Sequence, residues 1–156
     1  MPFDQEPTIA NNPQLRIPQR EGWQRIQSHF NLPDSAGEIG IVLPVGCGKS
    51  GLLAITPYAV NAKRVLVIAP GTRIRGQLSD DLRASSESNF YERCGILQPD
   101  DRFPETAVVA SGRVNMDDIR HCDVAVANIQ QIAGEENRWL NQLGPDFFDL
   151  ILVDEA

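Results

Sequence analysis

The sequence predicts an α/β protein in which a parallel sheet carries helices on both faces. Three observations favour this fold class. Apolar runs of strand type alternate with helical segments along the chain, some runs are unbroken in the manner of strands buried on both faces, and Gly or Pro residues separate the two kinds of segment. Because the carboxyl ends of parallel strands meet at one edge of a sheet, candidate functional residues are expected at that edge.

The composition is that of one soluble domain. A chain of 156 residues can bury a substantial core, and 42% hydrophobic with 22% charged residues is ordinary for a globular protein. No apolar run approaches the length of a membrane span, and residues 1–6 do not resemble a signal peptide. We therefore expect no membrane partner.

The cysteines and the net charge limit the location and the partners. The three cysteines, Cys47, Cys94 and Cys122, are far apart and odd in number, which is typical of free thiols in a reducing cytoplasm. The net charge is −7, whereas a free-standing nucleic-acid binder is usually basic. The charge argues against unaided binding of DNA or RNA but allows a local basic strip.

The N-terminal part of the chain predicts an arm and a first helix. Residues 1–14 hold three prolines and predict a flexible extended arm, so we expect the domain over 15–156. Pro18 fits the first turn of a helix that continues past Phe30, with apolar residues three and four apart on one face. The polar segment 31–37 ends this helix.

The next segments predict two strands, each followed by a helix. The first strand is Ile39–Leu43, and a helix from about Ser50 is expected to falter near Pro57. Arg64–Pro70 is an unbroken apolar run, typical of a strand buried on both faces. A turn then leads into a helix near Thr72–Ala84.

The C-terminal half predicts three more strands. Residues 107–110 form a short strand, and 123–127 form a more secure one that a helix over 129–143 follows. Residues 148–153 are the last strand, and carboxylates stand at its end. The region 90–104 has no clear periodicity, and no element is predicted there.

The turn after Leu43 has the sequence pattern of a phosphate-binding loop. Its residues are Pro44, Val45, Gly46, Cys47, Gly48, Lys49 and Ser50. Its glycines let the backbone wrap closely around phosphate oxygens, while backbone N–H groups and a helix N-terminus attract the anion. Lys49 supplies a full positive charge for the β and γ phosphates, and the Ser50 hydroxyl is placed to bind Mg²⁺. The general pattern has glycine where this chain has Leu43, so a glycine-rich turn that merely ends a strand is the alternative.

Asp154 and Glu155 are the candidate catalytic carboxylates. They follow an apolar strand and therefore fall at the same edge as the phosphate loop. An aspartate here can hold the Mg²⁺ that bridges the β and γ phosphates, and the next carboxylate can orient and deprotonate the attacking water. The alternative is an acidic pair that simply enters a loop.

Together these segments resemble the first RecA-like domain of superfamily 2 helicases and translocases, the group that includes DEAD-box, DEAH-box and type III restriction subunits. Residues 43–50 resemble motif I, which in this family also lacks the first glycine, and Val153–Ala156 resembles motif II. The resemblance implies a RecA-like fold, ATP and Mg²⁺ as cofactors, and catalytic roles for Lys49, Asp154 and Glu155.

Weaker motifs imply an adenine contact and a nucleic-acid edge. Leu15–Gln19 resembles the family's glutamine motif, which implies that Gln19 reads adenine. The segment 69–77 resembles motif Ia, and Thr72, Arg73 and Gln77 are its candidates for contact with DNA or RNA. An amphipathic helix with a solvated basic edge is the alternative for that segment. Asn128 occupies the place of a further nucleic-acid-binding motif.

The resemblance also implies parts beyond this chain. The sequence reaches Ala156 within motif II, so further strands and a second RecA-like domain with its arginine are expected in the full-length protein. Residues 1–156 alone are expected to hydrolyse ATP slowly or not at all. The alternatives are another P-loop NTPase, such as a GTPase or small-molecule kinase, and a non-catalytic nucleotide-binding fragment. The segment Asn61–Arg64 does not supply a guanine-reading motif.

Overall fold

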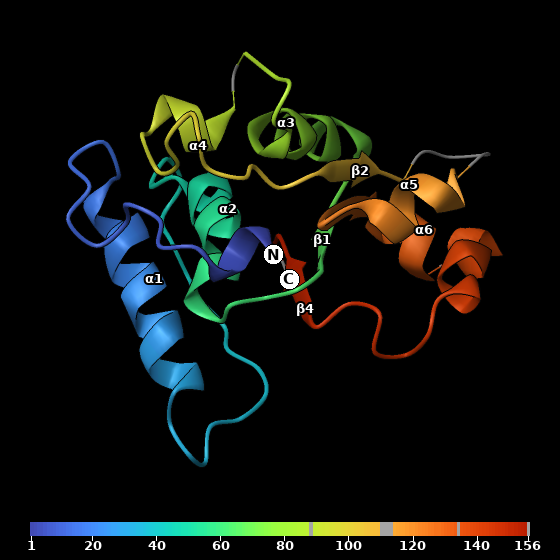
Figure 1. Cartoon of the computed structure of the whole chain (residues 1–156). Helices are drawn as coiled ribbons and strands as arrows, with labels where there is room; N and C mark the ends of the chain where they lie inside the picture. The colour runs from blue at the N-terminus through green and yellow to red at the C-terminus, as the bar shows by residue number, and fades with distance from the viewer. Residues whose placement is uncertain (88, 110–113, 134, 156) are drawn as a thin grey trace.

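The computed structural model describes residues 1–87, 89–109, 114–133 and 135–155. Its centre is a four-stranded sheet with the order β2-β3-β1-β4, and every pairing in it is parallel (Figure 1). The strands are β1 (Val65–Ala69), β2 (Thr106–Val108), β3 (Val124–Asn128) and β4 (Leu150–Val153). The predicted parallel α/β class is confirmed.

The two central strands are β1 and β3, and all five positions of each are buried. Their apolar sequences are unbroken because both faces of the sheet are covered. Val65 of β1 is in register with Val124 of β3 on one side and with Leu150 of β4 on the other. Asp149 fixes this register, since its carboxylate accepts the N–H groups of Lys63 and Arg64 just before β1.

Helices cover both faces of the sheet, as predicted, and each face has its own core. Val65 and Val67 pack into the cluster on one side, with α1, α2 and α3, whereas Leu66 and Ile68 pack into the cluster on the other side. This alternation follows from the two-residue period of a strand. The helices are α1 (Ile17–Phe30), α2 (Lys49–Ala59), α3 (Thr72–Leu82), α4 (Phe90–Arg93), α5 (Met116–His121) and α6 (Ile129–Ala133).

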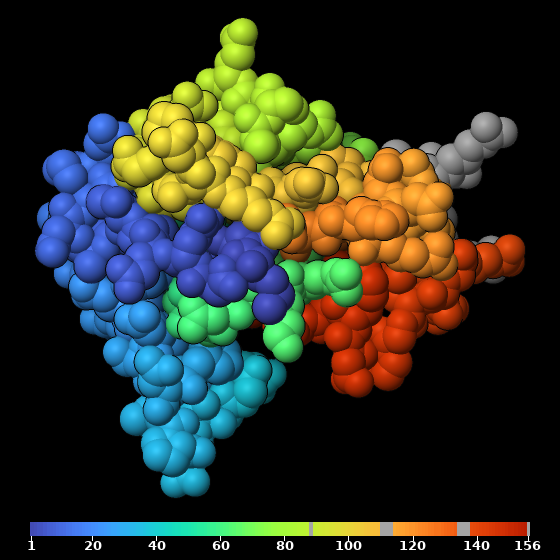
Figure 2. Space-filling view, in the orientation of Figure 1, coloured from blue at the N-terminus to red at the C-terminus, as the bar shows by residue number. Residues whose placement is uncertain are grey.

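Residues 1–14, predicted as a flexible extended arm, are packed onto the domain instead. Phe3 and Ile9 are buried in the larger core, and Phe3 lies edge-on against Tyr58 of α2. The Thr8 N–H donates to the carbonyl of Ile96 at 2.9 Å. Figure 2 shows these dark blue residues lying against the yellow segment that precedes β2. The apolar side chains among the prolines bury enough surface to hold the segment in place.

The predicted strand Ile39–Leu43 does not form. These residues have no regular structure, and the side chain of Val42 is 95% exposed. A strand needs a neighbour for its backbone hydrogen bonds, and no described residue pairs with this segment. The prediction of a strand over Ile39–Leu43 is therefore wrong, although the local apolar sequence is typical of one.

Several boundaries also differ from the predictions. Helix α2 continues through Pro57 to Ala59, and the predicted helix over 129–143 is divided into α6 and a 3-10 helix at Glu135–Gln142. Part of the unassigned region 90–104 is helix α4, whose Asn89 caps it by accepting from the N–H of Tyr91. The end of the predicted strand 107–110 lies outside the described residues.

Across the described ranges, no helix combines the length and apolar character that a membrane span requires.

Candidate functional site

The phosphate-loop residues form a tight turn that leads directly into α2. Gly46 and Gly48 have φ values of 81° and 86°, in the left-handed region that other residues rarely adopt. The Cys47 N–H donates to the Pro44 carbonyl at 3.2 Å, which closes the turn. Gly48 is the N-cap of α2, so Lys49 and Ser50 stand in its first turn. The positive end of an 11-residue helix therefore faces the loop.

Helix α1 is fastened to this loop by two side chains. Gln19 is 4% exposed, and its Nε2 donates to the Gly48 carbonyl at 2.9 Å. Its Oε1 accepts the N–H of Arg16 at 2.9 Å, which caps α1. The guanidinium of Arg16 donates to the Gly46 carbonyl. Both halves of the Gln19 carboxamide are therefore engaged within the chain, one of them with the phosphate loop.

The contact between Gln19 and α2 depends on glycine. A Cβ at Gly51 would collide with the Gln19 side chain and lie 2.5 Å from the Phe90 ring, and a Cβ at Gly48 would also overlap the Gln19 side chain. Phe90 belongs to α4, in the region for which the sequence predicted no element. Three segments far apart in the chain thus meet beneath the phosphate loop.

Strand β4 brings the carboxylate pair to the same edge of the sheet. The Asp154 N–H donates to the Ile68 carbonyl at 2.9 Å, so Asp154 stands beside the end of β1. Glu155 has a φ of 58°, which turns the chain back, and its Oε1 lies 3.3 Å from the Lys49 Nζ. Lys49 and the carboxylate pair Asp154 and Glu155, which are more than a hundred residues apart in the sequence, therefore lie together at the carboxyl end of the sheet.

The ion pair between Lys49 and Glu155 is open to solvent. The two side chains are 40% and 57% exposed, and exposed pairs contribute about 0–1 kcal/mol. A triphosphate, which carries several negative charges and several acceptor oxygens, competes well for the ammonium of Lys49. The pairing is consistent with a lysine that exchanges its carboxylate partner for a ligand.

The pKa of Asp154 is raised above the ordinary value of an aspartate. Partial burial is the main cause, because it disfavours the charged form, and the neighbouring charge of Lys49 opposes the shift. A carboxylate that is costly to ionise without a partner gains from a cation placed against it. The site therefore favours a metal ion or a positively charged group beside Asp154.

The donor set fits a magnesium ion shared with phosphates. Ser50 and Asp154 are partly buried at the same edge, and each offers oxygen, which Mg²⁺ prefers. Within the described residues, no group of three or more histidine, cysteine, aspartate or glutamate side chains could hold a metal ion on its own. Mg²⁺ commonly binds through one or two protein ligands together with substrate phosphates and water, and Ser50 and Asp154 supply that number of ligands.

Three of the four nucleic-acid candidates are exposed on one helix. Helix α3 begins at Thr72 directly after β1, and Thr72, Arg73 and Gln77 are all exposed. Its first turn lies at the same edge of the sheet as Asp154, because β1 and β4 run parallel and end together (Figure 1). A phosphate backbone can reach this turn from solvent.

Asn128, the fourth candidate, lies at that edge but is only 3% exposed. Its Oδ1 accepts the N–H of Gln131 at 3.0 Å, while the Gln131 Oε1 accepts the N–H of Asn128 at 3.0 Å. The two side chains form a reciprocal cap at the start of α6. The structure therefore gives Asn128 a role in starting the helix and leaves its side chain little access to a ligand.

Two residues that the sequence reasoning gave no role contact the site. Arg16 reaches the loop at Gly46, and Phe90 packs beside Gly51. Arg16 stands three residues before Gln19, in the segment already singled out, so its position was an available signal. No local signal marks Phe90, because its contact with α2 spans about forty residues of sequence.

Comparison with known proteins gives one family. The family model described as type III restriction enzyme, res subunit, matches residues 12–156. None of the curated proteins compared with the chain matches it. The matched range includes the phosphate loop, α3 and the carboxylate pair of β4.

Proposed function

Because the chain belongs to the family of type III restriction enzyme res subunits, we propose that it is the ATP-binding portion of an ATP-dependent nucleic-acid helicase or translocase. The observation that carries the proposal is the meeting of Lys49 with Asp154 and Glu155 at the carboxyl end of the sheet. Phosphoryl transfer needs mainly positioning and charge stabilisation, and these residue types supply both.

Each residue of the site has a role in the proposed chemistry. The backbone of residues 44–48 and the N-terminus of α2 bind the phosphates, and Lys49 neutralises charge on the β and γ phosphates. Ser50 and Asp154 would hold Mg²⁺, which supplies charge neutralisation and orients the triphosphate when bound. Glu155 orients the attacking water and accepts its proton.

Helix α1 supports the phosphate loop on the side where we propose that the adenine base binds. Gln19 donates to the carbonyl of Gly48, and Arg16 donates to the carbonyl of Gly46. We assign Gln19 to the adenine side of the site. Contact with the base requires the carboxamide to share its existing hydrogen bonds, so nucleotide binding and loop conformation are coupled through it.

The nucleic-acid partner binds along α3. Thr72, Arg73 and Gln77 are exposed, and Arg73 carries a positive charge on a chain whose net charge is −7. The first turn of α3 lies at the same edge of the sheet as the phosphate loop and motif II. A conformational change in either of them is therefore transmitted over a short distance to the nucleic-acid strand bound at α3. Efficient hydrolysis requires an arginine from a second domain, which is worth several orders of magnitude in rate in related NTPases.

The proposal is tested by isothermal titration of the chain with ATP, ADP and AMP, with and without Mg²⁺. Affinity is expected to rise with each phosphate and to require Mg²⁺ for ATP. Lys49→Ala should weaken ATP binding roughly ten- to hundred-fold, because a charge-assisted contact is lost. Lys63→Ala makes the same chemical change at the exposed opposite end of β1 and should leave affinity unchanged.

Two results would overturn the proposal. Equal binding of AMP and ATP would remove the phosphate loop from the interaction. Unchanged ATP affinity in the Lys49→Ala variant, with its fold intact, would show that the bound nucleotide lies elsewhere. Equal affinity for GTP would favour a different P-loop NTPase over an adenine-specific motor.

A further inference from the structure

The outer edge of β2 has unpaired backbone groups. The Val124 N–H donates to the Glu105 carbonyl at 3.0 Å and the Val109 N–H donates to the Val126 carbonyl at 2.9 Å, so alternate residues of this strand face β3. Thr106 and Val108, the residues between them, turn their N–H and C=O groups away from the sheet. Within the described residues, none of these four groups has a hydrogen-bond partner.

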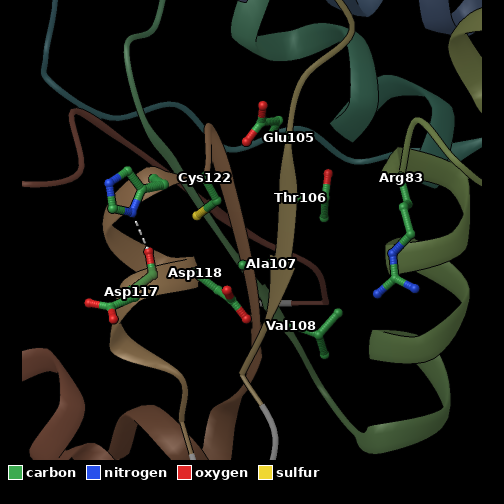
Figure 3. Close-up of a pocket in the computed structure, with 9 residues that line it drawn as sticks. Arg83, Glu105, Thr106, Ala107, Val108, Asp117, Asp118 and Cys122 are labelled. Atoms are coloured by element: carbon green, nitrogen blue, oxygen red, sulfur yellow. Dashed lines mark hydrogen bonds between the residues drawn. The ribbon is translucent and has the colours of Figure 1, made fainter.

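A groove of about 430 Å³ runs along this edge. Figure 3 shows β2 at its floor, with Arg83 from the end of α3 on one side and Asp117 and Asp118 of α5 on the other. Thr106 faces α3, since its Oγ1 donates to the Leu82 carbonyl at 3.2 Å. The groove is therefore a sheet edge between two helical walls of different charge.

The wall on the α5 side is acidic. Glu105 lies on the same face of the strand as Ala107, which packs toward α5, and Figure 3 shows the Asp118 side chain beside Ala107. Glu105, Asp117 and Asp118 are exposed, and only Asp117 has an ion pair among the described residues, with Arg120 at 3.6 Å. Glu105 and Asp118 thus line the groove without an ion pair among the described residues, and the imidazole of His121 lines the same wall.

We propose that this edge binds an extended peptide that carries Lys or Arg at every second position. Such a peptide adds a strand to β2 and pairs with the outward groups of Thr106 and Val108. Its side chains alternate between the two walls, so every second one meets Glu105 and Asp118. The charge of this wall repels a phosphate backbone, which distinguishes the partner from the nucleic acid proposed at α3.

The test uses NMR of the ¹⁵N-labelled chain and a capped hexapeptide of alternating Lys and Val. Addition of the peptide is expected to shift the amide signals of Thr106 and Val108 saturably and to slow their hydrogen exchange. The Ala107 amide faces β3 and should change less. The matched hexapeptide with Glu in place of Lys should bind at least about threefold more weakly, because two ion pairs are replaced by repulsion.

Two variants separate the backbone and charge contributions. Val108→Pro removes one outward N–H while leaving the ladder to β3 intact, and it should weaken the Lys peptide roughly three- to ten-fold. The double change Glu105→Gln and Asp118→Asn should remove the preference for Lys over Glu. As its control, Asp34→Asn with Glu38→Gln removes two exposed negative charges from the loop after α1 and should keep that preference.

Equal binding of the two peptides, or Lys-peptide shifts confined to residues away from β2, would overturn the proposal. So would an unchanged preference for Lys in the Glu105 and Asp118 double variant. These readouts stand even if Val108→Pro does not fold. They are also independent of ATP, so a failure of the nucleotide proposal would leave them unaffected.

Discussion

Gln19 is where the predicted and the observed roles of a single residue differ most. Its carboxamide was expected to read adenine, and in the structure it accepts from the Arg16 N–H and donates to the Gly48 carbonyl. The position of Gln19 in the first turn of a helix was predictable from the sequence. Its hydrogen-bond partners were not, because one of them lies 29 residues away in a loop whose conformation depends on packing.

Substitution of Gln19 therefore distinguishes a base contact from a loop support. If the side chain only holds the loop, Gln19→Ala should weaken the binding of ATP and of GTP equally. If it also reads adenine, as proposed, ATP affinity should fall more than GTP affinity. Loss of the helix cap is expected to lower the free energy of unfolding by about 1 kcal/mol in either case. Gln24→Ala, an exposed change on the same helix, is the control for titration and melting.

The raised pKa of Asp154 predicts that nucleotide binding depends on pH. Its pKa in the folded chain is raised by burial, so the neutral form persists to a higher pH than the ordinary 3.8. Since Mg²⁺ requires the carboxylate, Mg²⁺-dependent ATP affinity should begin to fall at a higher pH than for an unshifted aspartate. Titrations of the wild type and of Asp154→Asn from neutral to acidic pH check this, and the variant should lose the Mg²⁺-dependent step. A wild-type profile that is flat down to the ordinary aspartate range would contradict the assignment.

The same pKa shift has a consequence for stability. A raised folded-state pKa contributes stability below the unfolded-state value, and this contribution is lost as the pH rises through the folded-state value. Without nucleotide, Asp154→Asn should therefore make the chain more stable than wild type at neutral pH, and the difference should disappear in acid. Thermal melting at both pH values measures it.

At the scale of elements, the contact of α1 and α2 beneath the loop depends on a single missing side chain. A Cβ at Gly51 would overlap Gln19 and Phe90, and overpacking of this kind costs roughly 1–3 kcal/mol. Gly51→Ala is expected to destabilise the chain and to weaken ATP binding. Chemical denaturation and titration measure the two effects.

Gly76 provides the matched control for that substitution. It is also in a helix, α3, but a Cβ there meets nothing within 4 Å. Gly76→Ala should therefore stabilise the chain by roughly 0.5–1 kcal/mol, since alanine is the better helix former. Equal effects of the two substitutions would contradict the packing described beneath the phosphate loop.

The elements that the sequence predicted well are those with local causes. β1, β3 and β4 each contain an apolar run that predicts a strand, and β1 and β3 are buried throughout, whereas alternate residues of β4, Ile151 and Val153, are exposed. Ile39–Leu43 has the same local signal but no neighbouring strand among the described residues, and pairing is not a local property. Helix α4 has only four residues, too few for a periodic pattern to appear.

The candidate site was predictable in outline for a related reason. Parallel strands place their carboxyl ends together, so Asp154 could be assigned to that edge without coordinates. Lys49 was expected there through the strand Ile39–Leu43, which does not form. It reaches Glu155 from the first turn of α2 instead. The burial of Asn128 was not predictable, because it depends on reciprocal capping with Gln131. The packing of residues 1–14 was missed because prolines suggested an arm, while the burial of Phe3 and Ile9 depends on distant partners.

At the scale of the whole molecule, an acidic chain is proposed to bind an acidic polymer. The net charge of −7 opposes the approach of nucleic acid. The contribution of Arg73, at the start of α3, to nucleic-acid binding is therefore a direct contact with a nearby phosphate. Arg73→Ala should weaken binding to single-stranded oligonucleotides of every sequence alike. It should also reduce the slope of log affinity against log salt by about 0.7, the value for one phosphate of a single strand.

The exposed Arg25 of α1 supplies the comparison, because Arg25→Ala changes the net charge equally at a different surface. Fluorescence anisotropy over a range of salt concentrations measures both slopes. An effect of equal size in the two variants would indicate a general charge effect and would remove α3 from the interface.

The central claim is that the phosphate loop and the end of β4 share one metal-bound triphosphate. NMR of the ¹⁵N-labelled chain with Mn²⁺ and a non-hydrolysable ATP analogue tests it most directly, because the paramagnetic ion broadens the amide signals nearest to it. We predict that the signals of Ser50 and Asp154 broaden together and that those of Lys63, at the other end of the sheet, remain sharp. Broadening of Ser50 without Asp154, or of Lys63 in preference to both, would contradict the account.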